Sequence, residues 1–327
     1  MRVAGLAAQA ACMASLGRRV DLVELLLSGN RRALARAITL AETGGAAARA
    51  LLRAVYAHTG RAHIVGITGA PGAGKSTLVN ALAHHWRGSG KTIGIIAVDP
   101  SSPFTGGAIL GDRIRMQSLG GDPGIFIRSM ASRGRLGGIA RATGDAIDLL
   151  DAAGFDIVIV ETVGAGQGEV EIANAAHTTV VVEAPGMGDD VQTIKAGILE
   201  IADVFVVNKA DREGAEATIR QLRALLNLGG AQRDGWVPPI LPAVALRAEG
   251  IAAIATAIER HLEHLRAEER RADYERRRVA REFQLIVQET ALERARARMA
   301  DAEWDALVER IARREIDPYT AAEQLLA

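Results

Sequence analysis

The chain has 327 residues, which is enough for one large α/β domain with helical additions or for two domains, and its 49% apolar and 24% charged residues are ordinary values for a soluble globular protein. Basic and acidic residues both number 39, so no overall charge favours a nucleic acid or an anionic membrane as the partner. The single cysteine, Cys12, excludes a disulfide framework and a multi-cysteine metal site, and it favours a cytoplasmic location.

Residues 1–60 are predicted to form an N-terminal helical arm. The small apolar residues Val3–Leu16 resemble a short secretory segment, but they are rich in alanine and lead into an amphipathic pattern, which favours a helical or wrongly assigned start. No later run is long enough to cross a bilayer. The predicted helices of the arm are Val20–Leu27, Arg31–Leu40 with Asn30 as its cap, and Ala46–His58.

Residues 61–265 alternate between short Val/Ile-rich runs and helical patterns. The candidate strands are His63–Thr68, Thr92–Val98, Phe155–Val160, Thr179–Glu183, Val204–Val207 and Ile240–Val244. The helical windows include Ser76–Arg87, Leu136–Ala152, Ala215–Leu226 and Ile251–Leu265. This alternation predicts an α/β fold with a doubly wound, mostly parallel sheet, whose ligands bind at the carboxyl ends of the strands.

A phosphate-binding loop is predicted where the first strand turns into a helix. The run is Gly69-Ala70-Pro71-Gly72-Ala73-Gly74-Lys75-Ser76-Thr77. Its glycines allow backbone N–H groups to surround the β- and γ-phosphates, Lys75 reaches the phosphate oxygens, and the Ser76 hydroxyl binds Mg2+. A chance glycine-rich turn is the alternative, and the strand before and helix after the loop argue against it. The loop therefore predicts a nucleoside triphosphate site.

A guanine-reading sequence follows a later strand. In Asn208-Lys209-Ala210-Asp211, the Asp211 carboxylate can accept hydrogen bonds from the ring N1–H and the exocyclic amino group of guanine. Adenine offers neither donor there, so GTP is favoured over ATP. Val244-Ala245-Leu246 follows the last predicted strand and is expected to cap the base through a backbone N–H group.

Further polar residues stand where predicted strands end. Asp99 and Glu161 close two strands and can hold Mg2+ directly or through water. Gly164 can offer its N–H to the γ-phosphate, and Ala165 follows where many small GTPases carry glutamine, so we expect slow intrinsic hydrolysis. A cation for catalysis could come from several basic residues, each of which is equally consistent with an exposed loop cation: Arg113, Arg115, Arg133, Arg135 and Lys195.

Residues 266–327 differ in composition and are predicted to form a C-terminal helical extension. Arg266–Arg281 is dense in arginine and glutamate, and because the two signs alternate we interpret it as a charged helix face and not a nucleic-acid site. Phe283–Val287 restores an apolar stripe, and Asp317 begins a last short helix. An apolar stripe on a helical extension is typical of a dimerisation element.

From about Gly29 onward, the chain resembles the MeaB/ArgK family of P-loop GTPases, the methylmalonyl-CoA mutase-associated G proteins. The resemblance rests on four long blocks in the same order, which are Arg31–Thr39, Val98–Met116, Glu161–Gln167 and Pro185–Gly197. Two features depart from the family: Val244-Ala245-Leu246 stands where Ser-Ala-Leu is usual, and residues 1–16 match nothing in it. Backbone capping leaves the expected selectivity for GTP intact.

The resemblance implies a homodimeric GTPase that chaperones an adenosylcobalamin-dependent acyl-CoA mutase. Such proteins couple GTP binding and hydrolysis to loading of the cofactor from an adenosyltransferase, and to protection or reactivation of the mutase. Carried over by position, Ser76, Asp99 and Glu161 are the Mg2+ shell, with Asp112 as a further candidate. The segment Glu183–Lys195 resembles the family's mutase-sensing segment, which makes Lys195 a signalling or catalytic candidate beside Lys75 and Gly164.

Two alternatives remain at the level of the sequence. A metal-insertion GTPase of the kind that serves nickel enzymes predicts clusters of histidine and cysteine, which a lone Cys12 and scattered histidines do not supply. An ATP-using kinase of transport-system components would have to accept ATP despite Asn208–Asp211.

Overall fold

The computed structural model describes residues 22–100, 119, 121–132, 138–162, 168–186, 200–229, 235–266 and 268–326. The chain divides into two compact units, Met1–Arg271 and Ala272–Ala327. The first contains the sheet and the second is helical.

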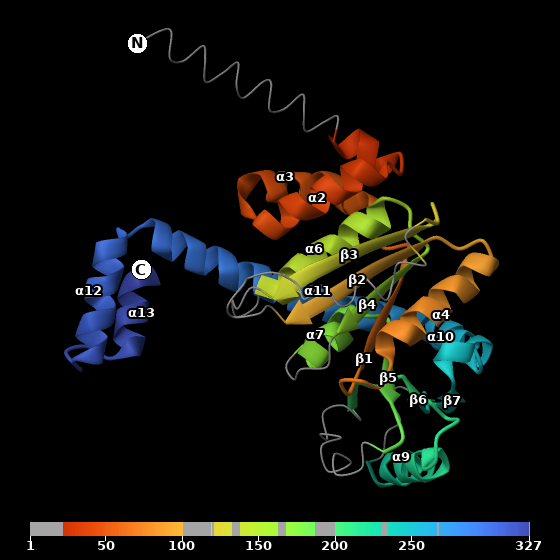
Figure 1. Ribbon diagram of the computed structural model, residues 1–327. Helices are drawn as coiled ribbons and strands as arrows, with labels where there is room; N and C mark the ends of the chain where they lie inside the picture. Colours follow the sequence, from red (N-terminus) through yellow and green to blue (C-terminus); the bar gives the residue numbers. More distant parts are fainter. Residues whose placement is uncertain are drawn as a thin grey trace. The chain divides into compact units, whose positions relative to one another are not determined.

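The first unit is built on a seven-stranded parallel sheet with the strand order β3-β2-β4-β1-β5-β6-β7 (Figure 1). From β1 the chain forms β2 and β3 on one side, returns to insert β4 between β1 and β2, and then forms β5, β6 and β7 on the other side. The doubly wound fold expected from the sequence is therefore confirmed. The strands are β1 (His63–Gly69), β2 (Ile93–Pro100), β3 (Ile125–Ser132), β4 (Ile157–Thr162), β5 (Thr178–Glu183), β6 (Val204–Asn208) and β7 (Ile240–Ala243).

Helices cover both faces of this sheet, and on one face a further pair of helices packs outside them. α4 and α10 share a core with one face, whereas α6, α7 and α9 pack on the other, and α2 and α3 pack against α6 (Figure 1). The helices are α2 (Arg31–Thr43), α3 (Gly45–Val55), α4 (Lys75–Gly88), α6 (Gly138–Ala152), α7 (Gly168–Ala175), α9 (Ala215–Gly229) and α10 (Ile251–Arg266), and residues 22–27 are also helical.

The central strands are apolar along most of their length because helices cover both faces of the sheet. Every residue of β1 is buried, and neighbours along it enter different cores: Val65 packs with α4 and α10, whereas Ile64 packs with α2 and α6. A strand covered on both faces needs a continuous apolar run and not an alternating one, which is why the central strands could be recognised from the sequence.

Strand β3 was missed by the sequence analysis, which proposed six strands. It lies at the edge of the sheet and carries Arg128, whose guanidinium forms an ion pair with Glu42 of α2 and donates to the Thr39 hydroxyl at 3.1 Å. An edge strand needs less apolar surface, and here a neighbouring helix satisfies the charge that interrupts its apolar pattern.

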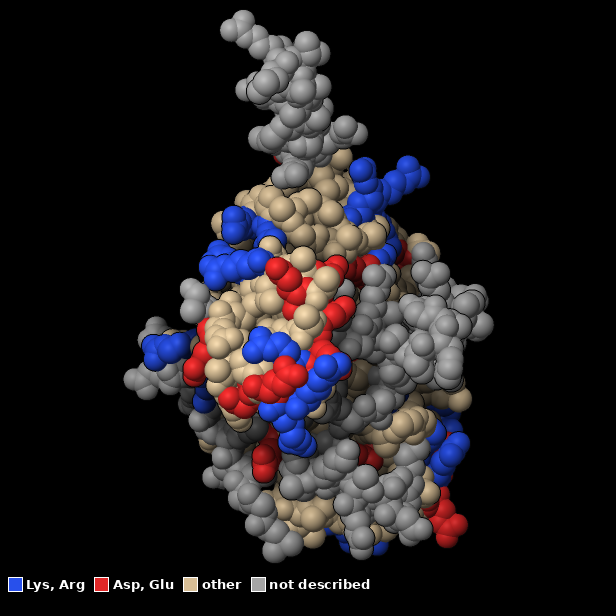
Figure 2. Space-filling model, turned by 90° about the vertical axis from the view of Figure 1, so that its left-hand side faces the viewer, with Lys and Arg blue, Asp and Glu red and all other residues tan. Residues whose placement is uncertain are grey.

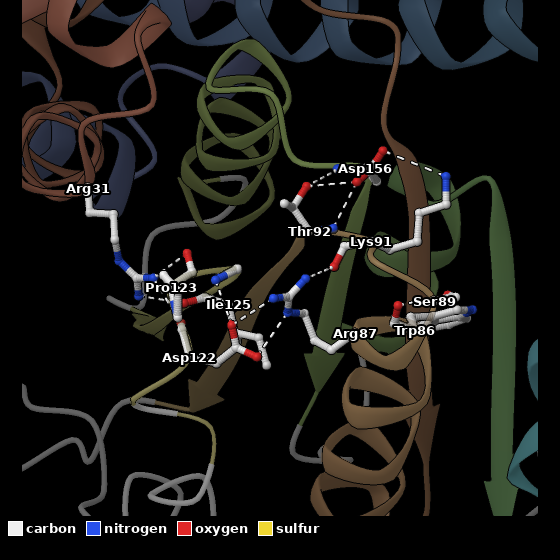
Figure 3. A network of polar contacts seen from close by, with 11 residues as sticks. Arg31, Trp86, Arg87, Ser89, Lys91, Thr92, Asp122, Pro123, Ile125 and Asp156 are labelled. Atoms are coloured by element: carbon white, nitrogen blue, oxygen red, sulfur yellow. Dashed lines mark hydrogen bonds and ion pairs between the residues drawn. The ribbon is translucent and has the colours of Figure 1, made fainter.

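A polar network fixes the turn that leads into β3 (Figure 3). The Asp122 carboxylate accepts hydrogen bonds from Nε and Nη2 of Arg87, at the end of α4, at 2.9 and 3.0 Å, which lowers the pKa of Asp122 below its usual value. Arg31 at the start of α2 donates to the carbonyl oxygens of Asp122 and Pro123, at 3.1 and 2.8 Å. The network therefore joins two helices to the edge of the sheet.

A buried polar chain crosses the amino-terminal ends of β1 and β5. His63 Nε2 and His261 Nδ1 each lie 3.0 Å from the hydroxyl oxygen of Thr178. His261 Nε2 lies 3.3 Å from a carboxylate oxygen of Asp203. Burial, with smaller contributions from nearby basic side chains, lowers the pKa of His63 and His261 to about 3, so both rings are neutral near pH 7.

The second unit contains most of α11 (Glu268–Ala297), with α12 (Asp301–Ala312) and α13 (Pro318–Leu326). Asp317 caps α13 by accepting hydrogen bonds from the N–H groups of Tyr319 and Thr320, at 2.9 and 3.0 Å. Acidic and basic side chains lie beside one another on the face shown in Figure 2. Within the described residues, no helix combines the length and apolar character needed to span a bilayer.

Candidate functional site

The predicted phosphate-binding loop lies between β1 and α4, at the carboxyl ends of the central strands (Figure 1). Gly69 and Gly74 have φ angles of +134° and +93°, a range that residues with side chains rarely adopt. A Cβ atom on Gly69 would lie 2.0 Å from the carbonyl oxygen of Val182 in β5, and one on Gly74 would lie 2.3 Å from Asn208 Nδ2. These glycines let neighbouring segments approach the loop closely.

Lys75 is folded into this loop. Its side chain is buried, and its ammonium group donates to the carbonyl oxygens of Gly69 at 2.8 Å and Ala70 at 2.9 Å. Phosphate oxygens carry more negative charge than these carbonyls, so they would form stronger hydrogen bonds with the same ammonium group. The loop thus holds a positive charge and a helix N-terminus in one place, a combination suited to polyphosphate.

Two of the predicted magnesium ligands lie in direct contact. Ser76, in the first turn of α4, donates its hydroxyl proton to Glu161 Oε1 at 2.6 Å, and both residues are buried. Glu161 belongs to β4, which lies between β1 and β2. A hydroxyl and a carboxylate oxygen at the end of a phosphate-binding loop fit Mg2+, which prefers oxygen ligands.

The other metal and catalytic candidates lie wholly or partly outside the residues that the structure describes. Asp99 lies in β2, two residues after Ala97, which pairs with Glu161. The backbone of Asp99 is therefore at the carboxyl ends of the strands, as Glu161 is, whereas the Asp99 side chain lies outside the described residues. Asp112, Gly164 and Lys195 also lie outside the described residues, as do the arginines proposed as catalytic cations: Arg113, Arg115, Arg133 and Arg135.

The predicted guanine box contacts both loops beside it. Asn208, the last residue of β6, is 3% exposed. Its side-chain amide donates to the carbonyl oxygen of Ala73 at 2.8 Å and accepts from the N–H of Ala245 at 3.0 Å. Lys209 has a positive φ of 57° and donates to the carbonyl oxygen of Gly72 at 2.7 Å. The box therefore links the phosphate-binding loop to the predicted cap.

Asp211 and the cap loop are held together by a residue that the sequence analysis did not single out. Arg247 Nη1 lies 3.1 Å from Asp211 Oδ2, while Arg247 Nε lies 2.7 Å from Glu249 Oε1. Val244, Ala245 and Leu246 lead into this arginine, and Leu246 is 87% exposed. The spacing of the guanine box offers no signal for Arg247, because the contact depends on how the two loops fold against each other.

A cavity of about 530 Å³ lies between α4 and the cap loop. This volume is within the range of small-molecule sites. Thr77, Ala245 and Leu246, which the sequence had identified, line part of it. Asn80 and His84 on α4 also line it and had not been identified. The last residue of the phosphate-binding loop and two residues of the predicted cap therefore line the same cavity.

The profile of the family described as "Methylmalonyl Co-A mutase-associated GTPase MeaB" matches residues 34–300. The chain belongs to the MeaB family of GTPases. A putative GTPase of Pyrococcus abyssi is 50% identical over 308 residues, which cover 94% of this chain and 95% of that protein. The GTPase ArgK of Escherichia coli is 40% identical over 245 residues, covering 73% and 74%.

A solved structure described as "Crystal structure of LAO/AO transport system kinase" has a TM-score of 0.71 with this chain at 28% identity, and the match covers 94% of this chain and 96% of that one. The family resemblance stated from the sequence is confirmed, and membership implies that the chain binds guanine nucleotides. The family is named for its association with methylmalonyl-CoA mutase.

Proposed function

We propose that this MeaB-family GTPase hydrolyses GTP slowly with Mg2+ and uses that cycle to chaperone an adenosylcobalamin-dependent acyl-CoA mutase of the methylmalonyl-CoA mutase type. In this proposal it gates loading of the cofactor, with the cobalamin adenosyltransferase as a second partner, and it protects or reactivates the mutase. The observation that carries the nucleotide part is the Asn208 amide, which joins the phosphate-binding loop to the cap loop. The mutase part rests on family membership.

Each predicted site residue has a role in this proposal. The phosphate-binding loop, Gly69–Thr77, surrounds the phosphates with N–H groups, and Lys75 exchanges its two carbonyl partners for phosphate oxygens. Asp211 reads the guanine ring, and Val244–Leu246 covers it. Asn208 and Lys209 support these loops.

Ser76 and Glu161 would hold Mg2+, with Asp99 and Asp112 completing the shell. When bound, the ion would neutralise charge on the phosphates. Gly164 would contact the γ-phosphate through its N–H group, and Lys195 would serve catalysis or signalling. No glutamine follows Gly164 directly, so hydrolysis would be slow until the mutase orders the site.

The homodimer is proposed to form through the apolar stripe of α11. Phe283, Ile286 and Val287 follow helical spacing and are 65%, 41% and 47% exposed. Burying this stripe against a second copy would remove apolar surface from water, at roughly 25 cal/mol for each Å². Gel filtration with light scattering of the intact chain measures the state directly, and a monomer at micromolar concentration would contradict this part of the proposal.

The deciding experiment measures steady-state GTP hydrolysis with and without a purified adenosylcobalamin-dependent acyl-CoA mutase. We expect a several-fold rise in the presence of the mutase with GTP and none with ATP. Lys75→Ala should abolish tight GTP binding, and Asp211→Asn should move preference from guanine towards xanthine nucleotides. Arg223→Met, an exposed substitution on α9, is the matched control and should leave both properties unchanged.

Two other functions would give different results. A metal-insertion GTPase would need a metal-binding cluster, and within the described residues no group of three or more His, Cys, Asp or Glu side chains is arranged to hold a metal ion. An ATP-using kinase of transport components, a reading favoured by the name of the solved relative, predicts brisk ATP turnover. Rapid ATP hydrolysis would overturn the GTPase proposal, whereas GTP hydrolysis unaffected by the mutase would overturn only the chaperone role.

A further inference from the structure

The guanidinium of Arg247 connects two carboxylates from different loops. Nε and Nη2 of Arg247 lie 2.7 and 3.3 Å from the two carboxylate oxygens of Glu249, and Nη1 lies 3.1 Å from Asp211 Oδ2. We call this set, Arg247, Asp211 and Glu249, the Arg247 bridge. Asp211 follows β6, whereas the other two residues follow β7. The bridge therefore fixes the guanine box relative to the cap loop.

The backbone of the cap loop holds Arg247 in place. Val244 and Glu249 form an antiparallel bridge, with the Val244 N–H donating to the Glu249 carbonyl at 3.1 Å and the reverse bond at 3.3 Å. Ala248, between the arginine and Glu249, has a left-handed φ of 56°, which closes the loop in few residues. The loop is closed at its base, so the position of Arg247 is restricted before any ligand arrives.

Asp211 needs such a partner in order to read guanine efficiently. Its side chain is 40% exposed, and an exposed carboxylate can sample several rotamers. A carboxylate has about four acceptor sites, so one contact with Arg247 leaves capacity for two donors of a guanine ring. Glu249 offsets the charge of Arg247 and leaves the three side chains with a net negative charge for those donors.

We propose that Arg247 is a positioning residue for guanine recognition, which holds the Asp211 carboxylate in the orientation that accepts the exocyclic amino group. The inference rests on the proposed role of Asp211 in reading guanine. Arg247 touches no reacting atom and acts through Asp211. A purely structural role in closing the cap loop would instead affect every purine nucleotide equally.

Inosine diphosphate separates these two roles, because hypoxanthine keeps the N1–H and O6 of guanine but lacks the 2-amino group. A misoriented Asp211 would lose a charge-assisted hydrogen bond to that group, whereas a loosened cap loop would weaken GDP and IDP together. The ratio of the two dissociation constants therefore measures the orientation of Asp211.

The experiment compares the full-length wild type with Arg247→Met, using isothermal titration calorimetry with GDP and IDP, and with Arg223→Met as the control. We expect Arg247→Met to lower the preference for GDP over IDP about tenfold, and the control to retain the wild-type preference. Thermal denaturation establishes that the variants are folded, and Arg247→Lys, with one donor group in place of the fork, should restore only part of the preference.

A change in the preference of less than fivefold in folded Arg247→Met overturns the inference, even if affinity for both nucleotides falls. If instead Asp211 does not read guanine at all, the wild type itself, titrated with ADP in the same way, would show no preference for GDP over ADP.

Discussion

Acidification should destabilise the sheet-containing unit through two buried histidines. Burial lowers the pKa of His63 and His261 to about 3, from an ordinary value of 6.5. Below pH 6.5 the unfolded chain binds protons at these positions while the folded protein stays neutral until near pH 3. Their contribution to stability is therefore complete above pH 6.5 and is lost progressively as the pH falls between these two values.

The size of the effect follows from the two pKa values. At pH 5, linkage gives about 2 kcal/mol for each histidine, or about 4 kcal/mol for both. A typical domain is stable by roughly 5–15 kcal/mol, so this loss is large. Ordinary carboxylates titrate near pH 4, so the histidines should account for most of the change between pH 7.5 and pH 5.

Urea unfolding followed by tryptophan fluorescence measures this loss, because Trp86 and Trp236 both belong to the sheet-containing unit. His63→Gln cannot take up a proton at that position and should lose about half as much stability on acidification, whereas exposed His58→Gln should behave as the wild type. Equal free energies of unfolding at pH 7.5 and pH 5 in the wild type would refute the reasoning, as would full acid sensitivity in His63→Gln.

Three further substitutions test the site and the second unit. Gly74→Ala should reduce GDP affinity at least a hundredfold with unchanged far-UV circular dichroism, because its methyl group would meet the Asn208 amide; wild-type affinity would contradict the strained loop. Asn208→Ala removes both hydrogen bonds of the side-chain amide and should weaken GDP binding at least tenfold by calorimetry. A smaller change would show that binding does not need the Asn208 link between the two loops. Phe283→Asp should yield monomers in light scattering. Leu292→Asp is the control, because helical periodicity places Leu292 on the opposite side of α11, and this variant should leave the proposed dimer intact. Monomers from both variants, or dimers from both, would argue against the apolar stripe as the interface.

The central fold could be predicted because its determinants are local. Strands such as β1 are apolar throughout, and the phosphate-binding loop has fixed spacing between a strand and a helix. β3 could not be predicted in the same way, since the charge on Arg128 is satisfied by Glu42, far away in the sequence. A local sequence pattern indicates which residues are buried, but it does not indicate that a distant helix supplies an ion-pair partner for a charged residue.

The candidate site likewise contains residues that could be predicted from local sequence and residues that could not. The phosphate-binding loop and the guanine box are contiguous motifs, so each could be predicted from residue types and spacing alone. Arg247 was not singled out because its contact with Asp211 depends on the packing of two loops, and the pairing of His63 with His261 through Thr178 depends on the order of the strands. Contacts of this kind become visible only when the sheet topology is known.

The position of Asn208 has a consequence for how this site could change in evolution or by design. One amide group spans the segments proposed to bind phosphate and base, so neither segment can shift without disturbing the other. A new base preference introduced at Asp211 alone would inherit the existing phosphate geometry. Transplanting a cap loop from another GTPase, however, would succeed only if its backbone still presents an N–H group to this amide.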